Sequence, residues 1–154
     1  MSSLNALMIA IDVAVRKRDE ARQALRERQN SFNAARSQLE QLENYVHEMN
    51  LRWGASEGMA IKPEVMFHHR QFMERLRHAV TLQTKVVADQ SIRLETAQKA
   101  LMAAELRLSS LNKVVEARRR DIALAQMRRD QKQTDERAAL QFIGRTFGMQ
   151  FQEA

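Results

Sequence analysis

The 154-residue chain has no cysteine, one proline and four glycines. Without cysteine it can form neither disulfides nor thiolate metal sites. Its proline and glycines fall only between positions 54 and 63 and after position 143. Because these residues interrupt helices most strongly, two long stretches contain no strong helix breaker. Ala, Leu, Arg, Gln and Glu dominate both stretches, a composition typical of long helices and coiled coils.

Aromatic residues are also scarce, and no apolar run near the N-terminus is long enough to cross a membrane. A secretory signal peptide has its basic residues before the apolar run, whereas Arg16, Lys17 and Arg18 follow the run at residues 6–11. We therefore expect a soluble, cytoplasmic protein. With so few aromatic residues a compact core is not expected, so the apolar residues must be buried along a seam between helices.

The first stretch has the apolar spacing of a coiled-coil seam when Leu4 is placed at heptad position a. Only two charged residues, Arg18 and Arg28, interrupt this seam. The a positions are Leu4, Ile11, Arg18, Leu25, Phe32, Leu39, Val46 and Trp53. The d positions are Leu7, Ala14, Ala21, Arg28, Ala35, Leu42 and Met49. The pattern predicts a helix over residues 3–53.

The second stretch has its own seam when Met66 is placed at position a. Its a positions are Met66, Met73, Val80, Val87, Leu94, Leu101, Leu108, Val115 and Ile122. Its d positions, which are more polar, are His69, Leu76, Gln83, Gln90, Ala97, Ala104, Leu111, Arg118 and Ala125. The pattern predicts a second helix over residues 63–140.

Residues 54–62 connect the two predicted helices. Gly54 is expected to take the left-handed conformation that ends a helix, and Pro63 to lie in the first turn of the next helix. A short connection makes neighbouring helices antiparallel. We therefore predict an all-α fold, a long antiparallel two-helix coiled-coil hairpin, as a single domain over residues 1–140.

We predict that facing residues in this hairpin have numbers that sum to about 115. Small residues then face large ones, as an evenly filled seam requires. The aliphatic part of Arg18 could lie along the seam while its guanidinium reaches water. The predicted pairs include Leu4 with Leu111, Arg18 with Ala97, Ala35 with Val80, Leu39 with Leu76, and Met49 with Met66.

The second helix is predicted to be the longer, at roughly 115 Å against roughly 75 Å. It should overhang the first by about 25 to 30 residues beyond Leu111. A single helix without a packing partner is only marginally stable in water. The overhang is therefore either a binding element for an acidic partner or a solvated face, and the net charge of +6 fits both. The Phe-rich tail, residues 141–154, is either a docking segment or loosely ordered.

A second candidate surface lies beside the seam near the connection. Tyr45 and Phe72 both occupy g positions, and g residues of antiparallel helices face each other. Exposed aromatic residues are frequent interface anchors, so this surface is either a docking site or a locally broadened core. We call it the tip stripe; it comprises Gln38, Leu42, Tyr45, Phe72, Leu76 and Ala79.

No metal, cofactor or catalytic site is expected. His68 and His69 are adjacent and point in different directions on a helix, and His47 and His78 have no histidine four residues away. The sequence contains no phosphate-binding glycine-rich loop and no Gly-x-Ser-x-Gly motif. A two-helix fold also offers no concave pocket, so an enzyme is not expected.

The chain resembles the flagellar FliJ family of type III export proteins over about residues 4–140. Three segments, in this order, carry the resemblance. They are Gln38-Leu39-Glu40-Gln41-Leu42-Glu43-Asn44-Tyr45, Gln71-Phe72-Met73-Glu74-Arg75-Leu76 and Arg129-Asp130-Gln131-Lys132-Gln133-Thr134-Asp135-Glu136.

The resemblance implies a cytoplasmic component of the flagellar export apparatus, held at the inner membrane through its partners. FliJ proteins look like the γ stalk of rotary ATP synthases. Their paired terminal ends insert into the hexameric export ATPase, FliI, and their hairpin tip contacts the export gate protein FlhA. Export chaperones are further partners. The gate contact carries over to the tip stripe. The ATPase contact carries over to a set that we call the ATPase set: Arg118, Arg119, Ile122, Arg129, Asp130, Gln131, Lys132, Asp135 and Glu136.

Two other functions are compatible with parts of the sequence. The stalk of a virulence secretion system shares the hairpin but has weaker sequence matches. A nucleic-acid-binding coiled coil is suggested by the basic charge, but the basic residues alternate with acidic ones and no basic region forks from a dimer zipper. We therefore expect no nucleic-acid partner.

Overall fold

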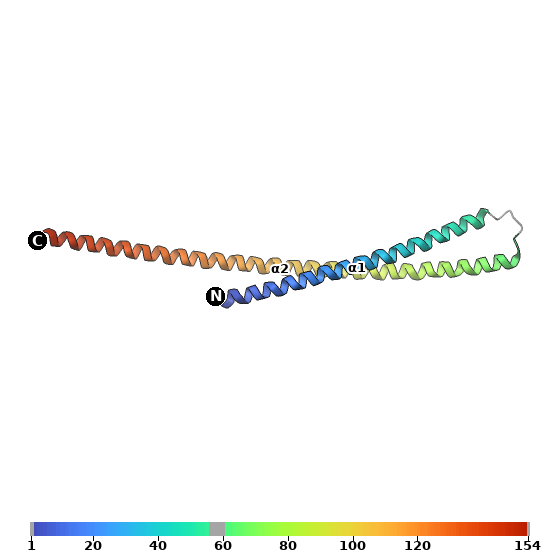
Figure 1. Cartoon of the computed structure of the whole chain (residues 1–154), viewed down its shortest axis with the longest axis horizontal. Helices are drawn as coiled ribbons and strands as arrows, with labels where there is room; N and C mark the ends of the chain where they lie inside the picture. The colour runs from blue at the N-terminus through green and yellow to red at the C-terminus, as the bar shows by residue number, and fades with distance from the viewer. Residues whose placement is uncertain (1, 56–60, 154) are drawn as a thin grey trace. The chain divides into compact units, whose positions relative to one another are not determined.

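The computed structural model consists of two helices and describes residues 2–55 and 61–153, with side chains for residues 3–54 and 61–148. Helix α1 is Ser2–Ala55 and helix α2 is Pro63–Glu153 (Figure 1). The described residues contain no strand. Two long helices packed against each other confirm the all-α fold that the heptads predicted.

The helix ends next to the connection match the prediction only in part. Pro63 is the first residue of α2, and the Lys62 carbonyl accepts hydrogen bonds from the backbone N–H groups of Val65 (3.1 Å) and Met66 (3.2 Å). The prediction for Gly54 is wrong. Gly54 lies inside α1, and no glycine among the described residues has a positive φ. The remaining loop predictions fall on residues 56–60, outside the described residues.

Helix α2 does not end at Leu140 as predicted but continues to Glu153. Gly144 and Gly148 lie within these last turns. A glycine weakens a helix by about 1 kcal/mol relative to alanine, but it keeps the backbone N–H that a proline lacks. The glycines therefore weaken this part of α2 without ending it.

Contacts divide the chain into two compact units. One unit is Ala14–Leu106, and the other consists of Met1–Val13 with Arg107–Ala154. In Ala14–Leu106, the α1 segment and the α2 segment run side by side in opposite directions (Figure 1). In the other unit, the first turns of α1 lie against α2, where the Arg119 Nη2 is 3.9 Å from the Met8 sulfur.

The buried side chains are seam residues, which confirms the predicted heptads up to Val115, whereas the predicted seam positions Arg118, Ile122 and Ala125 are exposed. Every a and d side chain of α1 is buried or half-buried, and the same holds for α2 from Met66 to Val115. All side chains of residues 116–148 are exposed. The buried residues among those described are Ala14, Ala35, Met73, Leu76, Leu108 and Val115.

The predicted pairing of the two seams is wrong by one heptad. The Trp53 ring stacks on the His69 imidazole with ring centroids 3.8 Å apart, and the two residue numbers add up to 122, not 115. In the other unit, Leu4 lines a groove with Arg118 and Ile122 rather than lying opposite Leu111.

The contact at Ala35, which was expected opposite Val80, is compatible with both registers. The carbonyl oxygen of Ala35 accepts a hydrogen bond of 2.9 Å from the Gln83 side-chain Nε2, and Gln83 lies within one turn of the facing position in either register. The apolar pattern repeats every seven residues, so both registers bury the same side chains. The apolar pattern alone therefore does not fix the register, and contacts between the helices such as the Trp53–His69 stack are needed to identify it.

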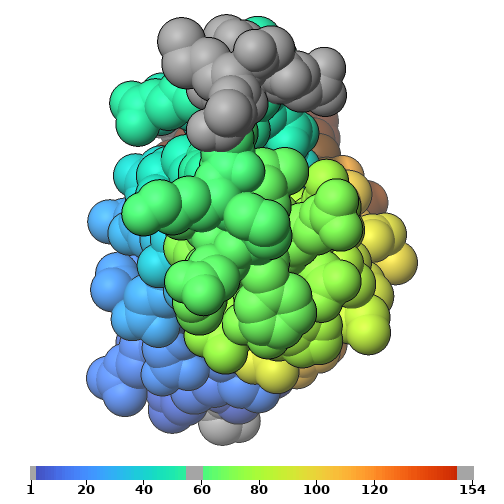
Figure 2. All heavy atoms as spheres, turned by 90° about the vertical axis from the view of Figure 1, so that its right-hand side faces the viewer, coloured from blue at the N-terminus to red at the C-terminus, as the bar shows by residue number. Residues whose placement is uncertain are grey.

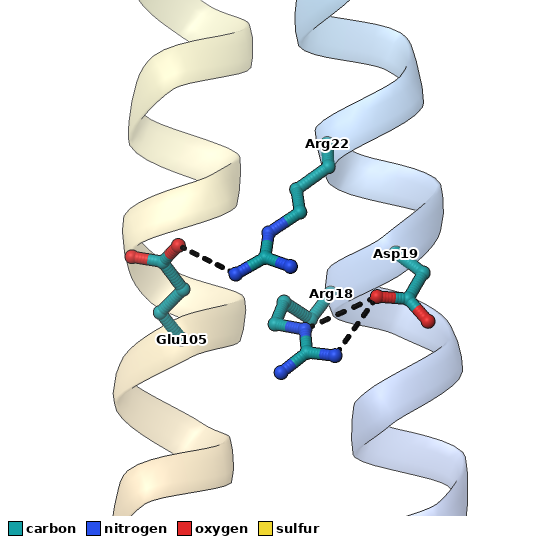
Figure 3. Close-up of polar contacts among 4 residues, drawn as sticks. All are labelled: Arg18, Asp19, Arg22 and Glu105. Carbon is teal, nitrogen blue, oxygen red and sulfur yellow. Dashed lines mark hydrogen bonds and ion pairs between the residues drawn. The ribbon is translucent and has the colours of Figure 1, made fainter.

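Arg18 is accommodated at its a position much as predicted, although the register moves its expected partner away from Ala97. Its side chain is 24% exposed, and its Nε and Nη2 donate to the Asp19 carboxylate at 3.2 and 3.0 Å (Figure 3). One turn further, Arg22 extends toward Glu105 of α2, with 3.9 Å between the charged atoms (Figure 3). Both partners of this second pair are about half exposed, so its contribution to stability is small.

Candidate partner-binding surfaces

The aromatic rings of the tip stripe face each other across the seam, as predicted. Tyr45 of α1 and Phe72 of α2 meet edge to face, with centroids 5.9 Å apart and ring planes at 83°. This geometry is favourable for an aromatic pair. The two residues nevertheless remain 44% and 41% exposed, so the contact leaves a large part of both rings open to solvent.

The aliphatic residues of the tip stripe lie deeper. Leu76 is buried, at 8% exposure, and Leu42 and Ala79 are half-buried. Leu76 is thus a seam residue, and the exposed part of this surface belongs mainly to Tyr45 and Phe72.

Gln38 is held toward α2 by a hydrogen bond. Its Oε1 accepts from the Gln83 Nε2 at 3.3 Å, and the same Gln83 nitrogen donates to the Ala35 carbonyl. These bonds explain how a glutamine is tolerated at a d position of α2. Gln83 therefore connects the tip stripe to the α1 backbone.

Figure 2 looks onto the end of the hairpin. Three apolar residues near this end lie outside the predicted seams and the tip stripe. Leu51, Val65 and Phe67 are exposed large apolar residues close to the connection. They occupy heptad positions f, g and b, which a solvated coiled coil normally fills with polar residues. That departure from the pattern is the signal that could have identified them.

The opposite flank of the seam is polar at the same level. Val46 and Val80 line a groove of about 320 Å³ together with Glu43, Arg77 and Thr81. Glu43 and Arg77 are e residues, whereas Tyr45 and Phe72 are g residues. The Tyr45–Phe72 contact therefore lies on the g side of the seam, and the groove lies on its e side.

The structure separates the ATPase set into two groups. In the first group, Arg118 and Ile122 line a groove of about 270 Å³ with Leu4 of α1. The Arg119 Nη2 lies 3.9 Å from the Met8 sulfur. These three residues lie beside the first turns of α1. The register shift thus extends the contact between the helices beyond Leu111, the predicted start of the overhang.

The second group lies further along α2, where all described side chains are exposed. It comprises Arg129, Asp130, Gln131, Lys132, Asp135 and Glu136. Asp130 accepts a hydrogen bond of 3.1 Å from the Gln126 side chain, within the same helix. Neither buried contacts nor ion pairs with α1 are recorded for this group among the described residues.

The described residues contain no group of three or more His, Asp or Glu side chains that could hold a metal ion. Neither α1 nor α2 has a described stretch that is long and apolar enough to span a membrane.

A family model with the description "Flagellar FliJ protein" matches residues 3–146, nearly the whole chain. The chain belongs to the FliJ family. Membership connects it with flagellar protein export, in which the family is a noncatalytic component. No curated protein and no solved structure matches the chain.

The FliJ match contains the tip stripe and the whole ATPase set. It ends at residue 146, before Phe147 and Gly148. The last turns of α2 are thus partly outside the region that the family model describes.

Proposed function

We propose that this FliJ-family protein is a noncatalytic coupling stalk of the flagellar export apparatus, acting at the cytoplasmic face of the inner membrane. The tip stripe binds the export gate protein, FlhA. The first turns of α1 and the ATPase set bind the hexameric export ATPase, FliI. Export chaperones are further partners.

The main support is that two surfaces stay exposed although the seam is complete without them. At the tip, Tyr45 and Phe72 keep more than two fifths of their surface open. Exposed aromatic residues that are not needed for folding are frequent anchors of protein interfaces.

The second surface is α2 after Val115, whose first turns lie beside Leu4 and Met8 of α1 and whose remaining turns have no recorded contact with α1 among the described residues. Helices gain most of their stability in proteins from packing, and residues 116–148 contribute no buried side chain. Ile122, Leu124 and Met127 are large apolar residues exposed in this segment, beside arginines such as Arg128 and Arg129. A partner that covers the apolar side chains and presents acidic groups would satisfy both features.

The gate contact is tested with Tyr45→Ala and Phe72→Ala combined. We expect the affinity for the purified gate domain to fall at least tenfold, because both anchors are lost. The melting temperature should change by only a few degrees. The matched control combines Arg77→Ala and Thr81→Ala on the opposite flank, which should leave the affinity unchanged. Equal loss in both variants would contradict the assignment.

The ATPase contact is tested with Arg129→Glu and Lys132→Glu combined. Both residues lie on α2 alone, so their reversal leaves the seam intact. We expect binding to the purified ATPase hexamer to weaken at least tenfold, and a chain ending at residue 115 to lose it. Lys85→Glu, an exposed reversal elsewhere on α2, is the control. Unchanged binding by the double variant and by the shortened chain would remove this role.

A further inference from the structure

The apolar residues of the two seams fit each other equally well in two registers. We call the register in which Trp53 faces His69 the observed register, and the one displaced by seven residues, in which Leu39 faces Leu76, the shifted register. Within Ala14–Leu106, the layers with two apolar residues in the observed register are Ala21 with Leu101, Leu25 with Ala97, Ala35 with Val87, Leu42 with Val80, Val46 with Leu76, and Met49 with Met73. In the shifted register they are Ala14 with Leu101, Ala21 with Leu94, Ala35 with Val80, Leu39 with Leu76, Leu42 with Met73, and Met49 with Met66. Both registers thus have the same number of apolar layers.

The polar seam residues do not choose between the registers either. A polar core residue fixes the register of a coiled coil when it meets a polar partner. Here every polar seam residue faces an apolar one in both registers; these residues are Arg18, Arg28, His69, Gln83 and Gln90. The buried Oε1 of Gln90 has no hydrogen-bond partner among the described residues, so the observed register leaves it unsatisfied.

Few recorded contacts belong to the observed register alone. One is the stack of Trp53 on His69, and another is the approach of Arg22 to Glu105 at 3.9 Å. Both members of this ion pair are about half exposed, so it contributes little. The hydrogen bond from Gln83 to the Ala35 carbonyl is within reach in either register. The preference for the observed register therefore rests on a small number of contacts.

Gly54 supplies a place for α1 to end one turn earlier. It lies inside α1 without a positive φ, and a methyl group added to it would meet no atom within 4 Å. No close contact among the described residues therefore requires a glycine here, although glycine weakens a helix. Glycine is also the residue that most easily takes the left-handed conformation that ends a helix.

We propose that the hairpin exchanges between the two registers, with α1 sliding along α2 by one heptad, about 10 Å. In the shifted register α1 ends at Gly54. Because α1 is one continuous helix, the slide also moves Leu4 away from its groove with Arg118 and Ile122 and toward Leu111. The slide therefore changes which α2 residues are open to a partner. It is a property of the free chain and does not depend on binding to the ATPase or to the gate.

Disulfide trapping of the full chain in a redox buffer tests the proposal, since the chain has no cysteine of its own. Leu42→Cys is combined with Val80→Cys for the observed register and with Met73→Cys for the shifted one. The matched control combines Leu42→Cys with Met66→Cys, which face each other in neither register. We expect both test pairs to close within one chain at least tenfold faster than the control. Closure of only one of them above the control rate would overturn the proposal.

Trp53 emission shows whether the second disulfide forms through a slide. A chain locked in the shifted register has lost the stack of Trp53 on His69, so its emission should lie at longer wavelength than that of the chain locked in the observed register. Equal emission from the two locked chains would show that the disulfide forms without a slide, and would overturn the proposal.

Gly54→Ala, added to each cysteine pair, tests the point at which α1 ends. Alanine favours the continuous helix and disfavours the left-handed conformation, so the shifted pair should close at least fivefold more slowly and the observed pair at an unchanged rate. The matched control is Gly144→Ala, because Gly144 is also a helical glycine with open space around it. Equal effects of the two alanines on the shifted pair would contradict a slide that ends α1 at Gly54.

Discussion

At the scale of single residues, two glutamines occupy successive d positions of α2 and differ in their surroundings. The Gln83 side chain donates to the Ala35 carbonyl and to Gln38. The Oε1 of Gln90 is buried and has no hydrogen-bond partner among the described residues. A buried polar atom without a partner destabilises a fold, whereas a bonded one is nearly neutral.

Replacing these glutamines by leucine should therefore give different results. Gln90→Leu removes an unpaired buried oxygen and adds apolar surface to the seam, so we expect a gain of about 1 kcal/mol in the free energy of unfolding. Gln83→Leu also removes two hydrogen bonds and should gain less. Urea denaturation measures both, and an equal or larger gain for Gln83→Leu would contradict this explanation.

The stacked pair of Trp53 and His69 provides a reporter inside the molecule, because Trp53 is the sole tryptophan. His69→Ala removes the ring that covers one face of the indole. We expect Trp53 emission to shift to longer wavelength and the unfolding free energy to fall by about 1 kcal/mol, the usual worth of an aromatic pair. His68→Ala is the control, since His68 is exposed and contacts Phe67 instead. Unchanged emission in His69→Ala would rule out the stack.

At the scale of the elements, the sequence predicts the seams well and their pairing poorly. The a and d positions follow from side-chain chemistry, and they are the buried positions of both helices up to Val115. The register does not follow, because a shift of seven residues leaves the apolar pattern intact. The end of α2 was also missed, since Gly144 and Gly148 suggested a break where the helix continues.

The register also decides how far each candidate surface could be predicted from the sequence. The opposition of Tyr45 and Phe72 was found because both are large residues at g positions, and the edge-to-face contact confirms it. The division of the ATPase set depends on the register, so the sequence could not separate Ile122, beside Leu4, from Arg129 on α2 alone.

The two parts of α2 should differ in local stability. Residues 63–115 include the buried seam, whereas residues 116–148 bury no side chain. Amide hydrogen exchange at low micromolar concentration should therefore be at least tenfold faster in the second part, because exposed helix opens locally at little cost. Equal protection in both parts would show that α2 is stabilised by contacts other than those with α1.

At the scale of the whole molecule, both proposed contacts require that the chain fold back on itself. The opposition of Tyr45 and Phe72 exists only if α1 and α2 are neighbours in one hairpin. The groove at Leu4 likewise needs the first turns of α1 beside Arg118. FliJ-family membership agrees with these features, and it rests on the match over residues 3–146 rather than on the contacts themselves.

The distance between spin labels at positions 22 and 105 tests this claim most directly, since the chain has no cysteine of its own to interfere. Arg22 and Glu105 approach to 3.9 Å in the structure, and paired helix axes lie about 8–10 Å apart. With Arg22→Cys and Glu105→Cys labelled in one chain and diluted with unlabelled protein, we predict a distance of about 25 Å or less. One continuous helix would separate the two positions by about 125 Å, and the loss of the short distance on dilution would contradict the hairpin.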